Sequence, residues 1–430
     1  MEKIKETGLK FCPKDHPQGL VVGLSESGEA ICVPHGEESR NENVMVFGPA
    51  GSGKTFAFTK PNLLACIDQG FSAVVSDPSG ELFSATYRMA VEKGICVRVL
   101  NVKSPDASDS WNCLASLEDP GEADALVTDT EDDYFALIEK NLFKCLVRYV
   151  AFSPNFSGEE RNIGAVCDVL DEIIKNEGEY PFFDELFEMH PTDPAASAWK
   201  KYKNCGQKQK QAALFGVSEK MRIFRIDLLK KIVSYNEIDL SLPGRKQCIY
   251  YVISSFQDRS MTPIINMFFT MAFQALIQEA EKNPDGKLKV PTMFILDEFK
   301  AIGKISRLSD IMANKCGISV SILIQDYMQL ERTYKDESRD ILSGCDTWVV
   351  LDINDPETAE IISDRPECAK NELQYFMELH RKNKILIIPR ECDIVEAERY
   401  GFIHHCLAEK VNRDSQIPDT DYVPERQNCR

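Results

Sequence analysis

The sequence predicts an α/β fold with a mainly parallel central sheet. Eight short apolar runs, many of them rich in β-branched residues, recur at 43–47, 73–77, 97–101, 248–254, 293–299, 318–325, 347–353 and 385–389. Strands that are apolar almost throughout are buried on both faces, as in a parallel sheet between two helical layers. Helical stretches separate most of these runs, which favours repeated units of strand, helix and strand.

The alternation stops after residue 101 and resumes near 248. The intervening stretch carries helical periodicity instead, most clearly at 134–150 and 224–233. We therefore expect a sheet domain built from residues 1–114 and 246–415, an inserted all-α domain at 115–245, and a flexible tail at 416–430. The apolar segment 261–280 is interrupted by Pro263, Asn266 and Gln274, so we interpret it as a buried helix and expect no membrane span.

The composition is that of a soluble globular protein, with 43% hydrophobic residues and a net charge of −18. Such a negative surface argues against general coating of nucleic acid, so any DNA contact must be local. One local candidate is the stretch 200–231, which contains ten Lys and Arg residues and only two acidic residues, Glu219 and Asp227. A solvated helix face explains this stretch equally well. An acidic run at 118–133 could recruit a basic partner or be an ordinary surface loop. The 15 cysteines form no metal-ligand pattern, which indicates reduced thiols.

The segment GPAGSGKT follows the first of these strands and precedes a helical stretch, which is the context of a phosphate-binding loop. We expect the loop to bind ATP through Gly48, Pro49, Ala50, Gly51, Ser52, Gly53, Lys54 and Thr55. Backbone amides and the helix N-terminus favour the phosphates. Lys54 is expected to bridge the β- and γ-phosphates, and the Thr55 hydroxyl to bind Mg²⁺.

Polar residues follow two later strands. Asp297 ends an apolar run and is expected to hold Mg²⁺ with Thr55, while Glu298 is the expected general base. Two carboxylates after a strand are weak evidence alone, but their pairing with the phosphate loop predicts hydrolysis. Gln325 is a candidate γ-phosphate sensor, or a glutamine in an ordinary loop. Asp77 either supports the site or caps the next helix.

Taken in order, these motifs resemble the coupling ATPases of type IV secretion and bacterial conjugation, the TraG-like and TraD-like proteins. The resemblance rests on the segments 43–55, 76–82, 97–114, 295–305, 317–330, 345–363 and 384–391. It covers both ends of the sheet domain, and in the family the interval between them is an all-α domain.

The resemblance implies a RecA-like motor, hexameric when active, that moves single-stranded DNA or hands over relaxase or effector proteins. It places the chain in the cytoplasm at the inner face of the bacterial membrane, beside inner-membrane channel components. Family members commonly carry N-terminal membrane helices; without them, a monomer is the alternative state.

Two departures from the family pattern stand out. Ser79 occupies a position where lysine is common, and no arginine precedes the strand at 318–325. The cation that would reach a neighbouring subunit's nucleotide is therefore unassigned, with Lys315, Arg307 and Arg332 as candidates, and its loss predicts slow hydrolysis. A nucleotide-dependent substrate receptor with weak ATPase activity, or another RecA-like DNA pump, remain the alternatives.

Overall fold

The computed structural model describes residues 8–36, 41–115, 117, 119–121, 134–255, 259–365 and 384–411. Within these ranges the strands form one twelve-stranded sheet in the order β1-β3-β2-β12-β11-β10-β4-β9-β8-β5-β7-β6. The described cysteines form no disulfide. Most of the acidic run at 118–133 and the tail at 416–430 lie outside the described residues.

The centre of the sheet is parallel, as predicted. β4 (Val44–Phe47) lies between β9 (Ile318–Ile324) and β10 (Thr347–Val350), and it is parallel to both. Beyond β9 follow β8 (Thr292–Leu296), β5 (Ser72–Asp77), β7 (Cys248–Ile253) and β6 (Cys96–Asn101). β4 and its neighbours are buried almost throughout, because helices cover both faces. The α/β fold class with a parallel central sheet is thereby confirmed.

The other half of the sheet is antiparallel, and its N-terminal part was not predicted. β11 (Lys384–Pro389) runs antiparallel to β10, and β12 (Val395–Glu398) antiparallel to β11. Three N-terminal strands complete this half, namely β1 (Lys10–Cys12), β2 (Leu20–Leu24) and β3 (Ala30–Val33). β2 joins β12 through the pair Leu24 and Glu398, so strands from both ends of the described chain are neighbours in the sheet.

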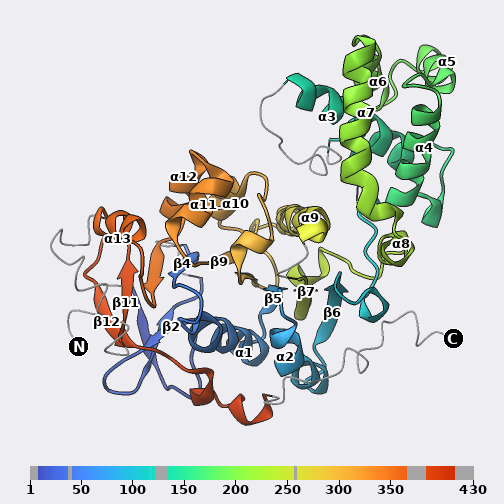
Figure 1. The fold of residues 1–430 in the computed structure, drawn as a ribbon. Coiled ribbons are helices and arrows are strands. Elements are labelled where there is room, and N and C mark those ends of the chain that lie inside the picture. The colour runs from blue at the N-terminus through green and yellow to red at the C-terminus, as the bar shows by residue number, and fades with distance from the viewer. Residues whose placement is uncertain are drawn as a thin grey trace. The chain divides into compact units, whose positions relative to one another are not determined.

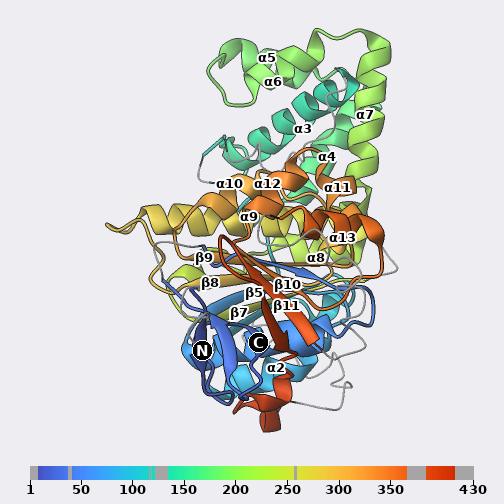
Figure 2. The same ribbon diagram turned by 90° about the vertical axis from the view of Figure 1, so that its left-hand side faces the viewer.

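Helices form a layer on each face of the sheet (Figures 1 and 2). One layer contains α1 (Lys60–Gln69) and α2 (Glu81–Glu92), and the other contains α10 (Leu308–Ala313), α11 (Tyr327–Tyr334) and α12 (Glu337–Ser343). α13 (Pro356–Ser363) packs on α11. The apolar segment near 270 is the helix α9 (Thr262–Glu281), and no described helix is long and apolar enough to cross a membrane.

The chain divides into two compact units. The first comprises Met1–Val99, Ser241–Gln257 and Phe273–Pro418 and contains most of the sheet; the second comprises Leu100–Leu240, Asp258–Ala272 and Asp419–Arg430. The helices of the second unit include α3 (Tyr134–Phe152), α4 (Ile163–Lys175), α5 (Pro181–Met189), α6 (Ala196–Lys203), α7 (Gln207–Met221) and α8 (Asp227–Ser234). The expected domain boundaries at 114/115 and 245/246 stay a prediction.

Half of the basic residues in the stretch 200–231 form ion pairs within the helical unit. Five of its cations lie in ion pairs with carboxylates, namely Lys203 with Asp184, Lys210 with Glu179, Lys220 with Glu139, Arg222 with Glu219, and Arg225 with Asp171. Lys210 is buried in its pair. These contacts favour the interpretation of this stretch as a helix surface stabilised by ion pairs over that of a dedicated DNA surface.

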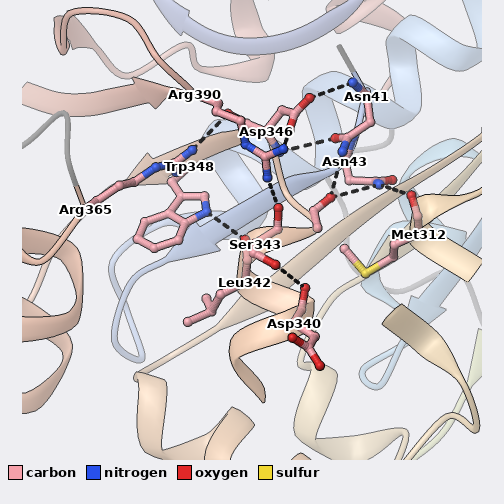
Figure 3. A network of polar contacts seen from close by, with 11 residues as sticks. Asn41, Asn43, Met312, Asp340, Leu342, Ser343, Asp346, Trp348, Arg365 and Arg390 are labelled. Carbon is pink, nitrogen blue, oxygen red and sulfur yellow. Dashed lines mark hydrogen bonds and ion pairs between the residues drawn. The ribbon is translucent and has the colours of Figure 1, made fainter. Parts of the chain in front are cut away.

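A buried asparagine fixes the amino end of the strand that leads to the phosphate loop (Figure 3). Asn43 is 2% exposed and donates through Nδ2 to the carbonyl oxygens of Met312, at 2.8 Å, and Gly344, at 3.1 Å. Its Oδ1 accepts a hydrogen bond from the Val320 amide at 2.9 Å. One side chain thus joins the start of β4 to β9, to α10 and to the end of α12.

A second set of polar contacts fixes the start of β10 (Figure 3). Asp346 accepts one hydrogen bond from the Asn41 amide, at 2.7 Å, and its carboxylate lies 2.8 Å from the Arg390 guanidinium. The Arg365 guanidinium lies 4.2 Å from the centre of the Trp348 ring and donates to the Asp346 carbonyl at 3.2 Å. Together these contacts set β4, β10 and β11 in register at the edge opposite the phosphate loop.

Candidate nucleotide-binding site

The predicted phosphate loop connects β4 to the helical segment that begins at Thr55. The Gly48 amide donates to the Ile324 carbonyl at 3.1 Å, and the Ser52 amide to the Pro49 carbonyl at 3.1 Å. Gly51 and Gly53 have φ angles of 81° and 83°, in the left-handed region that glycine adopts without steric cost. A Cβ on Gly48 would lie 2.4 Å from the Ser52 hydroxyl oxygen, so the close turn also requires glycine there.

The first turn after the loop is a π-helix, Thr55–Thr59, which continues into α1. Both threonines turn their hydroxyls to one carboxylate oxygen: Thr55 donates to Asp297 Oδ2 at 3.2 Å, and Thr59 at 3.1 Å. Single π-turns in α-helices are frequent at functional sites. Asp297 thus reaches the phosphate loop from the end of β8, two strands away, as predicted from sequence.

Asp297 is buried with another carboxylate beside it. Burial and the neighbouring Glu298 raise the pKa of Asp297 to about 6, although hydrogen bonds from Thr59 and Thr55 and the charge of Lys54 act in the opposite direction. Removing a carboxylate from water without a full counter-charge favours its neutral form. This environment is costly for the ionised acid and suits a residue that binds a divalent cation.

Glu298 adopts φ 49° and ψ 56°, an unusual backbone conformation for a non-glycine residue. Such strain of about 1 kcal/mol or more recurs at functional sites. The turn directs the half-buried carboxylate towards the end of β9, where Gln325 Nε2 donates to Glu298 Oε2 at 3.1 Å. The structure therefore brings Gln325 into contact with Glu298.

Lys54 is buried, with 6% of its surface exposed. Its ammonium donates to the carbonyl oxygens of Gly48 and, at 3.2 Å, Pro49. Burial lowers the pKa of Lys54, while the charges of Glu298 and Asp297 raise it. The cation is thus held inside the loop and close to both acids.

Sequence reasoning missed two contributors to the site. Thr59 lies four residues after Thr55, a helical spacing that could have revealed it. Arg399, which follows β12, donates to the Ser52 carbonyl at 2.8 Å and to the Leu351 carbonyl at 3.0 Å. No sequence signal marks Arg399, because this contact depends on the antiparallel half of the sheet.

Asp77 takes up the capping role. It is buried at the end of β5, and its Oδ2 accepts a hydrogen bond from the Phe83 amide at 2.8 Å, inside the first turn of α2. Ser79 completes this turn, since its hydroxyl contacts Asp77 Oδ1 at 3.4 Å and accepts from the Glu81 amide. Burial raises the pKa of Asp77 to about 6, and the charge of Asp297 contributes to that rise.

The three candidate cations lie in different places. Arg307 forms an ion pair with Asp310 at 2.8 Å. Lys315 lines a cavity of about 480 Å³ with Asn43 and Ile318, at the amino ends of β4 and β9 and away from the phosphate loop. Arg332 lies in the last turn of α11, the helix that follows the carboxyl end of β9.

The arrangement fits a magnesium nucleotide. The Ser52 hydroxyl is buried at the loop and has no hydrogen-bond partner in the described part of the chain. The loop glycines and the following helix N-terminus are features that favour phosphate. Thr55 and Asp297, already in contact, offer the oxygen ligands that Mg²⁺ prefers.

Comparisons with known proteins agree with this geometry. The family model described as Type IV secretory system Conjugative DNA transfer matches residues 14–366. The fold is similar to the bacterial conjugative coupling protein TrwBdeltaN70 in complex with sulphate, at TM-score 0.65 and 15% identity over 89% of this chain and 87% of that one.

Two further structures are similar. TrwB in complex with the non-hydrolysable ATP analogue ADPNP matches at TM-score 0.63 and 16% identity, over 89% of this chain and 88% of that one. VirB4 of Thermoanaerobacter pseudethanolicus matches at TM-score 0.57 and 11% identity, over 89% of this chain and 96% of that one. A search of curated proteins finds no match.

Proposed function

Because the chain belongs to the type IV secretory system conjugative DNA transfer family, we propose that it is an ATP-hydrolysing coupling protein that recruits and moves DNA or protein substrates into a secretion channel. One observation carries the hydrolytic part of this proposal. Asp297 and Glu298 lie at the phosphate loop, the first in contact with Thr55 and the second with Gln325. A loop that only bound nucleotide would not need this second carboxylate.

Each residue has a role in the proposed site. The loop amides and Lys54 bind the phosphates, while Thr55 and Asp297 hold Mg²⁺, which neutralises phosphate charge. Glu298 accepts a proton from the attacking water as general base. Gln325 holds the Glu298 carboxylate in place, as their 3.1 Å contact supports, and is close enough to respond to the nucleotide state.

The partners in this proposal come from the family. They are single-stranded DNA, relaxase or effector proteins, and inner-membrane components of the channel, with a homo-hexamer at the cytoplasmic face of the membrane as the active form. Structures of relatives with ADPNP, and with ADP and Mg²⁺, support Mg²⁺ and ATP as ligands.

The test is ATP turnover of the full chain with and without single-stranded DNA, in the wild type, Glu298→Gln and Lys54→Ala. Loss of the general base should reduce turnover by about 100-fold or more while ATP still binds. Lys54→Ala should lose binding as well. Turnover that ignores both Glu298→Gln and DNA would refute the motor.

A nucleotide-dependent receptor with weak ATPase activity is the second candidate. The sequence before β9 favours it, because this segment carries no arginine at the position where the family pattern has one that can reach a neighbouring subunit's nucleotide. Sizing with ATP, Mg²⁺ and single-stranded DNA separates the candidates. A ring that forms only with these ligands supports the motor, whereas a persistent monomer with Glu298-independent turnover supports the receptor.

A further inference from the structure

An apolar surface begins one residue after the phosphate loop. Phe56 is 43% exposed although it directly follows the Mg²⁺ candidate Thr55, and Ile403 is 55% exposed. The half-buried ring of Phe402 lies 5.2 Å from the Phe56 ring at an angle of 75°. We call Phe56, Phe402 and Ile403 the aromatic surface.

The aromatic surface is built from two segments held tightly together. A Cβ on Gly401 would lie 2.6 Å from an atom of the Phe56 ring, so a larger residue there would displace the ring from this position. The Lys60 ammonium lies 5.3 Å from the centre of the Phe402 ring. Arg399 joins the same segment to the Ser52 carbonyl in the loop. The C-terminal segment is thereby fixed beside the phosphate loop.

The direction of a bound nucleotide follows from the loop itself. Loop amides cradle the α- and β-phosphates, and the γ-phosphate end faces the Mg²⁺ ligands and the general base. Asp297 and Glu298 mark that end. The α-phosphate, with the ribose and base attached to it, therefore lies on the side of the loop away from these acids. Phe56, the residue after the Mg²⁺ ligand Thr55, exposes its ring beside the loop.

We propose that the aromatic surface of Phe56, Phe402 and Ile403 binds the base of the nucleotide by stacking. This inference rests on the proposed nucleotide site and extends it to the base. Phe56 and Ile403 expose apolar area to water beside the phosphate loop, and a stacked base would cover part of that area.

The chemistry of the aromatic surface also predicts its selectivity. Its three side chains offer apolar and π faces, and every base has a π face, so stacking discriminates weakly among bases. Purines present the larger ring. ATP and GTP should therefore bind with similar affinity, and pyrimidine triphosphates less tightly.

The experiment measures affinities of the full chain for Mg·ATP, Mg·GTP and Mg·tripolyphosphate by isothermal titration. Phe56→Ala and Phe402→Ala should weaken ATP and GTP binding by about tenfold, the order of one lost base stack, and leave tripolyphosphate binding unchanged. Phe56→Tyr should retain wild-type affinity because it keeps the ring. The matched control is Phe215→Ala, a 71% exposed phenylalanine of α7, which should change nothing.

Three results would overturn the proposal. One is that Phe56→Ala and Phe402→Ala both bind ATP as tightly as the wild type does, even if their self-association changes. Another is an equal loss for ATP and tripolyphosphate, which would indicate a distorted loop. The third is a wild type that binds ATP no more tightly than tripolyphosphate, while Lys54→Ala abolishes the binding of both ligands. That result would support the phosphate site and refute only the base site. A wild type that binds neither ligand overturns the proposed function as well.

Discussion

Neutralising Asp297 should stabilise the protein in the absence of nucleotide and metal. Asp297→Asn keeps the shape of the side chain, whose oxygens accept from the Glu298 amide and from the Thr55 and Thr59 hydroxyls. An asparagine amide can donate to the same hydroxyl oxygens. The substitution therefore removes the buried charge while keeping the packing.

The magnitude follows from the pKa of Asp297, which burial raises from 3.8 to about 6. Between these values the folded protein binds more protons than the unfolded chain, so stability falls as the pH rises through this window. A shift of roughly two units corresponds to about 3 kcal/mol. The free energy of unfolding of Asp297→Asn, relative to wild type, should rise by about that amount between pH 4 and pH 7 and then level off.

The assay is urea denaturation of both proteins in EDTA from pH 4 to pH 8. Asp310→Asn, which neutralises an exposed carboxylate, is the matched control and should show no comparable change. Added Mg²⁺ and ATP should then stabilise the wild type and not Asp297→Asn. A difference between wild type and Asp297→Asn that stays flat across the pH range would refute the reasoning.

Two other variants test contacts that the structure revealed. Thr59→Val removes a hydrogen bond that lowers the pKa of Asp297, so in EDTA the upper end of the pH window over which the free energy of unfolding falls should move up by about half a unit to one unit; an unmoved window would contradict the role of Thr59. Asn43→Ala leaves the Met312 and Gly344 carbonyls and the Val320 amide without this buried partner. It should lower the free energy of unfolding by about 3 kcal/mol in urea titrations, and a loss under about 1 kcal/mol, as for a surface substitution, would count against it.

The parallel half of the fold could be predicted from sequence because its strands are continuous apolar runs. Runs such as 43–47 and 318–325 are apolar enough to demand burial on both faces, and each became a strand. The phosphate loop and Asp297 share this advantage, since parallel strands deliver their carboxyl ends to one edge. For these residues the local sequence pattern was therefore enough to predict their place in the fold.

The antiparallel half was harder to predict for a physical reason. β1 has only three residues, β2 and β3 follow each other without a helix between them, and β2 pairs with β12 from the other end of the chain. Arg399 and the aromatic surface depend on that pairing, so no local signal could place them beside the loop. The π-turn at Thr55–Thr59 was equally out of reach, because helix propensity does not separate it from an α-helix.

The position of β4 has a consequence for how the protein reaches its native state. β4, which leads to the phosphate loop, can pair only after β9 and β10, which begin at Ile318 and Thr347, have been synthesised. Closing such long loops makes folding slow and leaves apolar edges exposed meanwhile. During synthesis the loop emerges early but takes shape among the last elements, so chaperone protection of the nascent chain should matter more here than for a domain of local contacts.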